Sequence, residues 1–285
     1  MSSTLVKAAV EQGRIFLANS KQVSIQDPLF EARLFMQSVL DVTAAQYILK
    51  CDDAISSEDY SRYMSYIEQR ATGKPVAYIL GKTGFWTLEL MTNSHTLIPR
   101  SETELLVEWA ISLTLYEKAR VLDLGTGTGA IALSLASEKQ SWQVYGVDRI
   151  QGAVHLAEQN AKLNGLSAQF LQSDWFSVFE QDKLGFDLIV SNPPYVEESS
   201  EYLHQGDLRF EPRSALVAAN SGLADIKQIV AQSPQYLNAG GWLGIEHGFE
   251  QHNAVQTLLD ESGFSAIKTI KDLNNLPRVT VGQFR

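Results

Sequence analysis

From residue 120 to the C-terminus, short apolar runs alternate with stretches long enough for a helix. The last two apolar runs are too close together for a helix between them, so we expect the final strand to enter the sheet antiparallel. The first six apolar runs alternate with stretches of helical length, which indicates a parallel sheet with helices on both faces, an α/β fold. The predicted strands are 120–124, 143–148, 168–172, 186–190, 241–246, 264–270 and 278–284.

The first part of the chain has a different pattern. Asp27 precedes a proline and an apolar run, the pattern of a helix N-cap followed by proline in the first turn. Ser56 or Ser57 can cap a second long helix, whose apolar residues recur at helical spacing. Residues 1–72 therefore predict a small all-helical domain.

Aromatic and β-branched residues interrupted by glycines follow this domain. They indicate a β-hairpin connector at 73–98. Ser101 and Glu104 have the spacing of a capping box that opens the next helix. We assign 99–285 to the α/β domain.

Charge and composition exclude several classes of protein. The chain has 285 residues, and its formal charge is −10. Residues 91–285 hold 14 basic and 23 acidic side chains, which disfavours a surface for nucleic acid. No apolar run approaches the roughly 20 residues of a membrane span, and no signal peptide is expected. The single cysteine, Cys51, and the absence of metal-ligand spacing predict a metal-free protein of the cytoplasm.

A glycine loop follows the first strand of the α/β domain. Its sequence is Gly125-Thr126-Gly127-Thr128-Gly129, and a helical stretch comes next. Glycines let a ligand approach the backbone closely, and the helix start adds free N–H groups. Asp148 ends the following strand, 19 residues beyond Gly129, where a carboxylate commonly binds ribose hydroxyls. The loop fits either a dinucleotide or S-adenosylmethionine.

A stiff corner follows the fourth strand. It reads Asn192-Pro193-Pro194-Tyr195, and its prolines cannot continue a helix or a central strand. An asparagine oxygen and a proline carbonyl are two acceptors that suit a planar –NH2 group, and the tyrosine ring offers it a flat wall. This corner favours methyl transfer to an amino or amide nitrogen over hydride transfer to a nicotinamide.

Further polar and aromatic residues are relevant to the site. Trp175 follows the third strand and can stack on an adenine ring, with Asp174 reaching its amino group. We interpret Glu246 and His247 as packing residues. We interpret Arg100 as a residue that stabilises the start of the next helix; the alternative is that it reaches the opening of the cofactor site.

Taken together, these motifs resemble the HemK/PrmC family of protein-glutamine N5-methyltransferases, which modify peptide-chain release factors. The chain departs from the family at Ser101, where proline is usual, and Pro277-Arg278 is also unusual but is expected to lie far from the chemistry. The motifs that carry the resemblance are 73–81, 98–100, 102–104, 123–129, 192–195 and 207–212.

The resemblance implies a Rossmann-like methyltransferase sheet and a reaction with S-adenosylmethionine, leaving S-adenosylhomocysteine. The substrate would be the glutamine of the Gly-Gly-Gln loop of class I release factors, in support of translation termination. The helical domain would dock the release factor, and the enzyme is expected to be a monomer. The implied cofactor residues are Gly125 to Gly129, Asp148, Trp175 and Asn192; Asn192, Pro193, Pro194 and Tyr195 would hold the amide, with Asn192, Pro193 and Tyr195 catalytic.

Three alternatives remain open. Asn-Pro-Pro-Tyr is shared with adenine-N6 methyltransferases of nucleic acids, against which the acidic α/β domain counts. A glutamine methyltransferase acting on a large-subunit ribosomal protein would differ mainly in its N-terminal domain. A cofactor-binding scaffold without catalysis would have no need of an intact Asn192.

Overall fold

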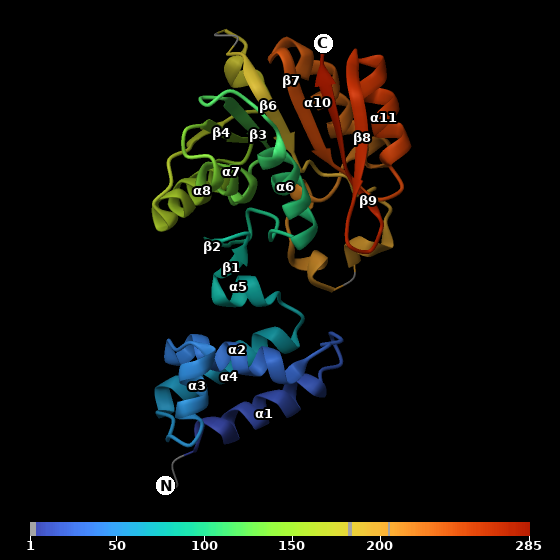
Figure 1. Cartoon of the computed structure of the whole chain (residues 1–285). Helices are drawn as coiled ribbons and strands as arrows, with labels where there is room; N and C mark the ends of the chain where they lie inside the picture. Colours follow the sequence, from blue (N-terminus) through green and yellow to red (C-terminus); the bar gives the residue numbers. More distant parts are fainter. Residues whose placement is uncertain (1–3, 182–183, 205) are drawn as a thin grey trace. The chain divides into compact units, whose positions relative to one another are not determined.

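The computed structural model describes residues 4–181, 184–204 and 206–285 (Figure 1). These residues form two compact units. One contains the chain up to Gly81 together with 204–210, and the other contains 82–203 with 211–285. No helix within the described residues is both long and apolar enough to cross a membrane.

The helical unit packs around fully buried side chains, among them Phe35, Tyr63 and Ile67. The two predicted caps are confirmed, because Asp27 accepts from the Phe30 N–H at 2.9 Å and Ser56 from the Asp59 N–H at 3.0 Å. Each satisfies an N–H group that the helix itself leaves unpaired. The helices are α1 (Val6–Ala18), α2 (Pro28–Leu40), α3 (Ala44–Lys50), α4 (Ser57–Ala71) and α5 (Val76–Leu80).

A distant segment, the 3₁₀ turn Gly206–Phe210, belongs to the same unit. Arg70 is buried and donates to Glu31 at 2.7 Å and to Asp207 at 3.2 Å. Arg209 donates to the carbonyl of Thr72 at 2.9 Å. A buried guanidinium needs such partners, since leaving it unpaired would be strongly destabilising.

The connector differs from the prediction in its first half. Where the hairpin was expected to start, α5 forms instead; Pro75 stands at its N-cap and Gly81 ends it with a φ of 72°. Proline is common at the start of a helix, and glycine at its end. The hairpin is the shorter pair β1 (Lys82–Phe85) and β2 (Leu88–Met91).

The second unit contains a seven-stranded sheet within the described residues, in the order β5-β4-β3-β6-β7-β9-β8. Neighbours from β5 to β7 are parallel, and β9 is antiparallel to both β7 and β8, as predicted for the final strand. The strands are β3 (Arg120–Leu124), β4 (Gln143–Asp148), β5 (Gln169–Gln172), β6 (Phe186–Ser191), β7 (Leu237–Glu246), β8 (Phe264–Lys271) and β9 (Pro277–Phe284).

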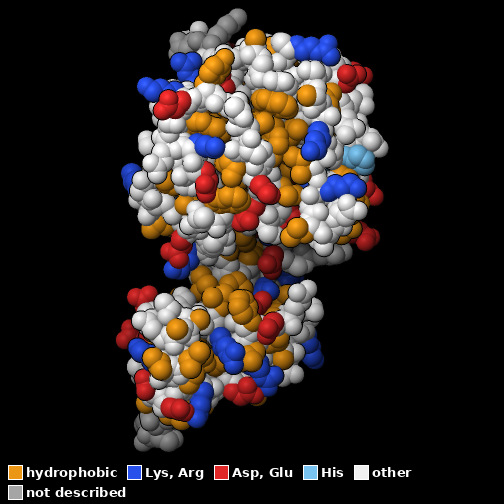
Figure 2. Space-filling view, in the orientation of Figure 1, with side chains coloured by type: hydrophobic (Ala, Val, Ile, Leu, Met, Phe, Trp, Pro, Cys, Tyr) orange, Lys and Arg blue, Asp and Glu red, His pale blue; other side chains and the backbone are white. Residues whose placement is uncertain are grey.

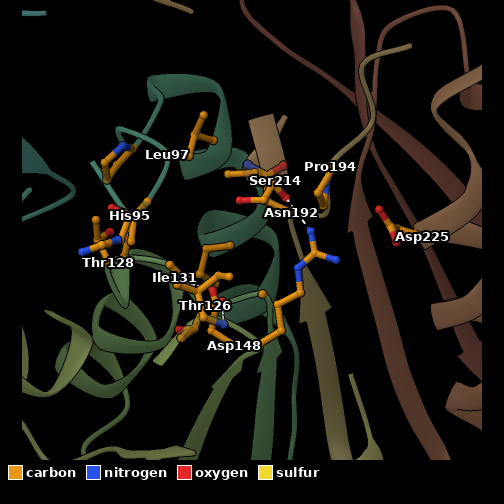
Figure 3. Close-up of a pocket in the computed structure, with 18 of the residues that line it drawn as sticks. His95, Leu97, Thr126, Thr128, Ile131, Asp148, Asn192, Pro194, Ser214 and Asp225 are labelled. Carbon is orange, nitrogen blue, oxygen red and sulfur yellow. Dashed lines mark hydrogen bonds between the residues drawn. The ribbon is translucent and has the colours of Figure 1, made fainter. Parts of the chain in front are cut away.

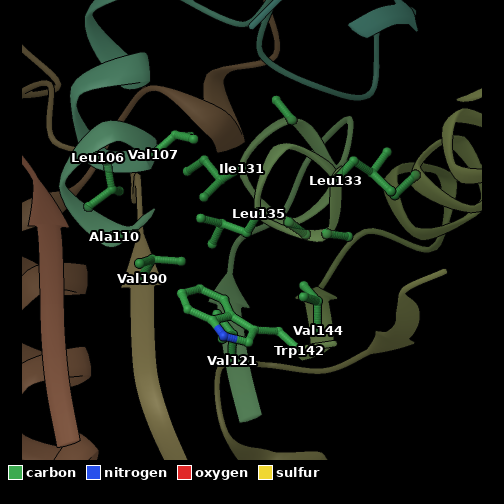
Figure 4. Packing of buried hydrophobic residues seen from close by; sticks show 14 of the residues in the cluster. Leu106, Val107, Ala110, Val121, Ile131, Leu133, Leu135, Trp142, Val144 and Val190 are labelled. Atoms are coloured by element: carbon green, nitrogen blue, oxygen red, sulfur yellow. The ribbon is translucent and has the colours of Figure 1, made fainter. Parts of the chain in front are cut away.

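Helices cover both faces of the sheet because successive strand residues point to opposite sides. Val121 and Val190 pack toward α6 (Glu104–Ser112), α7 (Ala130–Glu138) and α8 (Gln151–Asn164) (Figure 4). Leu122 and Ile189 pack toward α10 (Ala224–Gln232) and α11 (His252–Glu261). The short turn α9 (Ala219–Gly222) precedes α10.

Two local predictions are wrong. A helix was expected between the third and fourth strands, but the described residues there contain only the 3₁₀ turn Ser177–Phe179. Trp175 adopts a φ of 48°, so it cannot itself be part of a right-handed helix. The capping box is also absent, because Glu104 accepts from the Trp86 N–H at 2.8 Å and Ser101 bonds Glu102.

The strand order reverses direction at β3, the kind of point at which open α/β sheets bind ligands. The chain runs outward from β3 to β4 and β5, then returns to β6 on the other side of β3. Leu124 pairs with Ser191 and with Val147 in register, and Ser191 pairs with Ile245. The segments that follow β3, β4, β6 and β7 therefore begin side by side.

Candidate active site

A pocket lies at this sheet edge, and all its lining residues belong to the second unit. In Figure 3, Asn192 and Pro194 extend from the end of their strand toward the space beside Thr126 and Asp148. His95 and Asp225 stand at opposite sides of it. The lining comprises 95–97, Pro99, Thr103, 125–128, Ala130, Ile131, 148–150, 173–175, Asn192, Pro194, Ser214, Ala215 and Asp225.

The glycine loop wraps the end of β3 as the motif predicts. Gly125 and Gly127 have φ values of 73° and 55°, and residues with a Cβ rarely adopt such positive values. Gly129 has a φ of 81° but does not line the pocket. A Cβ there would lie 3.1 to 3.3 Å from Leu133, Ala157 and Phe170, so this glycine allows α7 to pack tightly.

Asp148 is the last residue of β4 and lines the pocket. Its carboxylate accepts from the Gly127 N–H at 3.0 Å and from the Ile150 N–H at 2.9 Å. Burial raises the pKa of Asp148, while these two backbone hydrogen bonds and Arg149 oppose the rise. The bonds fix the direction of both oxygens at the pocket wall.

Asp123 opens the motif 123–129, and the structure gives it a specific role. It is fully buried in β3 and accepts from the Thr126 hydroxyl at 2.7 Å and from the Ala132 N–H at 3.3 Å. Burial raises the pKa of Asp123 to about 7. The carboxyl therefore holds the loop against the start of α7. The sequence signal for this role is an acidic residue within an otherwise apolar strand, because a buried acid needs hydrogen-bond partners.

The opposite wall of the pocket contains residues that the sequence predicted and one that it did not. Asp174 and Trp175 line the pocket, as their position after β5 predicts. A Cβ on Gly125 would lie 3.5 Å from the Trp175 ring, so this ring lies next to the glycine loop. Arg149 donates to the Ser214 carbonyl at 3.1 Å and closes the wall with residues from an irregular loop, which no motif marks.

Only part of the Asn-Pro-Pro-Tyr corner lines the pocket. Asn192 and Pro194 do, whereas Pro193 is buried and Tyr195 is not among the lining residues. Asn192 Nδ2 donates to the Thr103 hydroxyl at 3.1 Å. This bond uses the amide's donor side and leaves Oδ1 as the acceptor. The Tyr195 hydroxyl donates to Glu246 Oε1 at 3.3 Å.

Glu246, the last residue of β7, and His247, which follows it, are both buried, as their interpretation as packing residues predicts. His247 pairs with Thr280 at 2.7 Å and with the Gly248 carbonyl at 2.9 Å, and burial lowers the pKa of its ring. Glu246 does more than fill space, because the Tyr195 hydroxyl donates to it.

Arg278 was expected to lie far from the chemistry, and this is wrong. Since β9 runs back along β7, Val279 pairs with Glu246 and the Arg278 carbonyl accepts from the His247 N–H at 2.9 Å. Its charge lowers the pKa of Glu246. Antiparallel pairing between strands distant in sequence produced this proximity.

Arg100 does not line the pocket. It forms an ion pair with the buried Glu211, whose other oxygen accepts from the Ile98 N–H at 3.0 Å. These contacts support the segment that contributes Leu97 and Pro99 to the wall.

Known proteins share this organisation. Residues 8–81 match the PrmC N-terminal domain and residues 101–207 the Methyltransferase small domain. A release factor glutamine methyltransferase of Shewanella oneidensis is 47% identical over 82% of this chain and 81% of its own. One from Vibrio cholerae is 43% identical over 98% and 96%.

A solved structure shares the fold at low identity. The 16S rRNA N2 G1207 methyltransferase of T. thermophilus, in complex with AdoMet and guanosine, is 22% identical with a TM-score of 0.52. The match covers 72% of this chain and 50% of that one. The much higher identity with the two curated relatives, over most of the length of both chains, shows that this chain belongs to the family of release factor glutamine methyltransferases.

Proposed function

We propose that this enzyme transfers a methyl group from S-adenosylmethionine to the side-chain amide nitrogen, N5, of a glutamine. The observation that carries the proposal is the register between β3 and β6. Because Leu124 pairs with Ser191, the glycine loop and Asn192 leave the sheet side by side. A methyl donor on the loop would then lie next to an amide held by Asn192.

The pocket residues fit the donor in three parts. Asp148 would bind the ribose hydroxyls, because its carboxylate is fixed at the pocket wall. Trp175 and Asp174 would hold the adenine ring beside Gly125. The loop from Gly125 to Gly129 would supply backbone close to the amino-acid end, with Gly129 acting through helix packing.

The chemistry needs orientation more than acid–base catalysis. An amide nitrogen is a poor nucleophile because its lone pair is delocalised. Asn192 Oδ1 and the Pro193 carbonyl would accept both N–H groups, with Pro194 and Tyr195 supporting the plane of the amide. S-adenosylmethionine would supply the methyl group: the nitrogen–carbon bond would form as the sulfur–carbon bond breaks, S-adenosylhomocysteine would be left, and one amide proton would go to solvent. The two fixed acceptors stabilise the positive charge that develops on nitrogen.

The substrate of this chain is proposed to be the Gly-Gly-Gln loop of class I release factors. Family membership supports a release factor as the substrate, since the curated relatives are release factor glutamine methyltransferases. We propose that the predicted helical domain, 1–72, docks the release factor, that the enzyme is monomeric, and that it works in the cytoplasm. Figure 2 shows acidic and basic side chains interspersed on the face it draws, which supports a protein partner over nucleic acid.

The test is methyl transfer from labelled S-adenosylmethionine to purified substrates. A class I release factor should become labelled, and the same factor with alanine in place of the loop glutamine should not. Label on a large-subunit ribosomal protein alone, or on DNA or RNA, would select a rival function. The donor or its demethylated product should raise the melting temperature, whereas NAD should not.

A further inference from the structure

A buried asparagine, Asn160, lies on α8 and is not among the residues that line the pocket. Its exposed fraction is 0%, and the other buried residues of this helix are alanines, a valine and a leucine. An amide in such surroundings costs free energy unless its polar atoms find hydrogen-bond partners. The partners of Asn160 therefore show what this amide contributes that an apolar residue could not.

Two of these partners belong to the β1–β2 hairpin. Asn160 Oδ1 accepts from the Met91 N–H at 2.7 Å, and Nδ2 donates to the Met91 carbonyl at 3.1 Å. The amide thus bonds both backbone groups of one strand residue, as a neighbouring strand would. Met91 ends β2, and the segment that follows contributes 95–97 and Pro99 to the pocket wall. Asn160 therefore holds the start of this wall segment.

The third partner belongs to the glycine loop. Asn160 Nδ2 also donates to the Thr128 carbonyl at 2.9 Å. The N–H of the same peptide unit, that of Gly129, donates to the Thr126 carbonyl at 2.8 Å. Because a peptide unit is planar, bonds at both of its ends fix the direction of the plane. Thr126 and Thr128 line the pocket, so the direction of this plane shapes the pocket wall.

The wall segment and the glycine loop face each other. A Cβ added to Gly127 would lie 3.9 Å from the Cβ of Thr96. In Figure 3, His95 and Thr128 lie at the side of the pocket away from Asp225. Since other residues are proposed to bind the adenine ring and the ribose, the amino-acid end of S-adenosylmethionine is left for this part of the pocket.

We propose that Asn160 is a positioning residue that holds the glycine loop and the 92–99 segment together around the amino-acid end of S-adenosylmethionine. It acts through the Thr128 carbonyl on one side and through Met91 on the other. One amide suffices because its two protons and its oxygen reach both segments at once. This inference rests on the proposed function, from which it takes the placement of the donor.

A second asparagine on the same helix offers a matched control. Asn164 lies about one turn after Asn160. Its Nδ2 donates to the Glu89 carbonyl of β2 at 2.9 Å and to the Asn160 carbonyl at 2.9 Å. Asn164 thus connects α8 to the hairpin, but none of its hydrogen bonds among the described residues reaches the glycine loop. Comparing the two positions separates the connection to the loop from the connection to the hairpin.

Calorimetric binding of two ligands tests the proposal without methyl transfer. S-adenosylhomocysteine has the amino-acid end, whereas 5′-methylthioadenosine keeps the adenine, ribose and sulfur but lacks it. Asn160→Ala should raise the Kd of S-adenosylhomocysteine about tenfold, the effect of weakening one hydrogen bond to a ligand. The Kd of 5′-methylthioadenosine should stay the same, and Asn164→Ala should change neither value. A general loss of folding would instead weaken both ligands.

A second measurement needs no ligand. Hydrogen exchange of the Gly129 amide, followed by NMR, reports on its bond to the Thr126 carbonyl. Exchange should become faster in Asn160→Ala and stay unchanged in Asn164→Ala. If Asn160→Ala does not fold, Asn160→Asp takes its place. The aspartate keeps the shape and the acceptor for the Met91 N–H, but as a carboxylate it has no proton for the two carbonyls.

The outcomes distinguish this proposal from the proposed function. Equal changes in the Kd of the two ligands, or equal effects of the Asn160 and Asn164 variants, would overturn the positioning role. Unchanged binding and unchanged Gly129 exchange in the Asn160 variant would do the same. An unsubstituted enzyme that binds neither ligand would instead overturn the proposed donor, and Gly129 exchange would still show whether Asn160 holds the loop.

Discussion

Gly129 allows a packing cost to be measured separately from a backbone cost. Its φ of 81° lies in the left-handed region, where a side chain costs about 1–2 kcal/mol. A Cβ at this position would also meet Leu133 at 3.1 Å, Ala157 at 3.2 Å and Phe170 at 3.3 Å. These neighbours come from α7, α8 and β5 and are themselves buried, so they cannot all move aside.

We expect Gly129→Ala to lose both contributions. Overpacking of a buried site typically costs about 1–3 kcal/mol, which brings the total to about 2–5 kcal/mol. Gly165 is the matched control, because it has a φ of 65° at the end of α8 and a Cβ added there would meet no atom within 4 Å. Gly165→Ala should therefore lose only the backbone contribution, about 1–2 kcal/mol.

Urea unfolding followed by circular dichroism measures both losses. The difference between the two variants, about 1–3 kcal/mol, is the packing contribution. Gly129→Ala should also weaken binding of S-adenosylmethionine, since the start of α7 and the loop before it would shift. Equal losses of stability in the two variants would refute the argument that α7, α8 and β5 leave no room at this position.

Three further predictions concern the site and its surroundings. Asn192→Ala should lower kcat by about 10²–10³ with folding and cofactor binding intact, and near-normal turnover would exclude Asn192 as an acceptor for the substrate amide. Because burial raises the folded-state pKa of Asp123 to about 7, stability should fall as pH rises from about 4 to about 7; pH-dependent urea unfolding of Asp123→Asn should lack this slope. Leu49→Asp, at a side chain 82% exposed in the helical unit, should slow methylation of the whole release factor but not of a Gly-Gly-Gln peptide. Leu273→Asp, the control at an exposed leucine of the other unit, should slow neither, and an equal effect of both variants would argue against docking by the helical unit.

Local sequence patterns predicted those parts of the fold that local interactions determine. The strands were found because apolar runs of four to eight residues mark buried strands. The caps at Asp27 and Ser56 were found because each bonds an N–H group three residues ahead. The glycine loop, Asp148 and Asn192 were predicted to form a ligand site because each lies at or just after the end of a strand, and residues of all three line the pocket.

What the sequence did not predict depends on contacts between distant residues. Glu104 has the spacing of a capping box, but the Trp86 N–H in the hairpin turn competes for its carboxylate. Arg278 lies beside Glu246 only because β9 pairs with β7. Ser214 belongs to the pocket wall, and its backbone carbonyl accepts from Arg149. Every residue has a backbone carbonyl, so the sequence cannot indicate this contact.

The loop that follows the Asn-Pro-Pro-Tyr corner bears on how the helical domain can be studied. Asp207 is bound by Arg70 within the helical unit, and Glu211, four residues later, is bound by Arg100 and the Ile98 N–H in the other unit. Removing residues 1–72 would strip Asp207 and Arg209 of their partners while leaving Glu211 in place. A truncated enzyme would then have a disturbed loop whose far end supports the pocket wall at Pro99. Slower methylation after truncation could therefore not be assigned to lost docking, and single exposed side chains such as Leu49 are the cleaner probes.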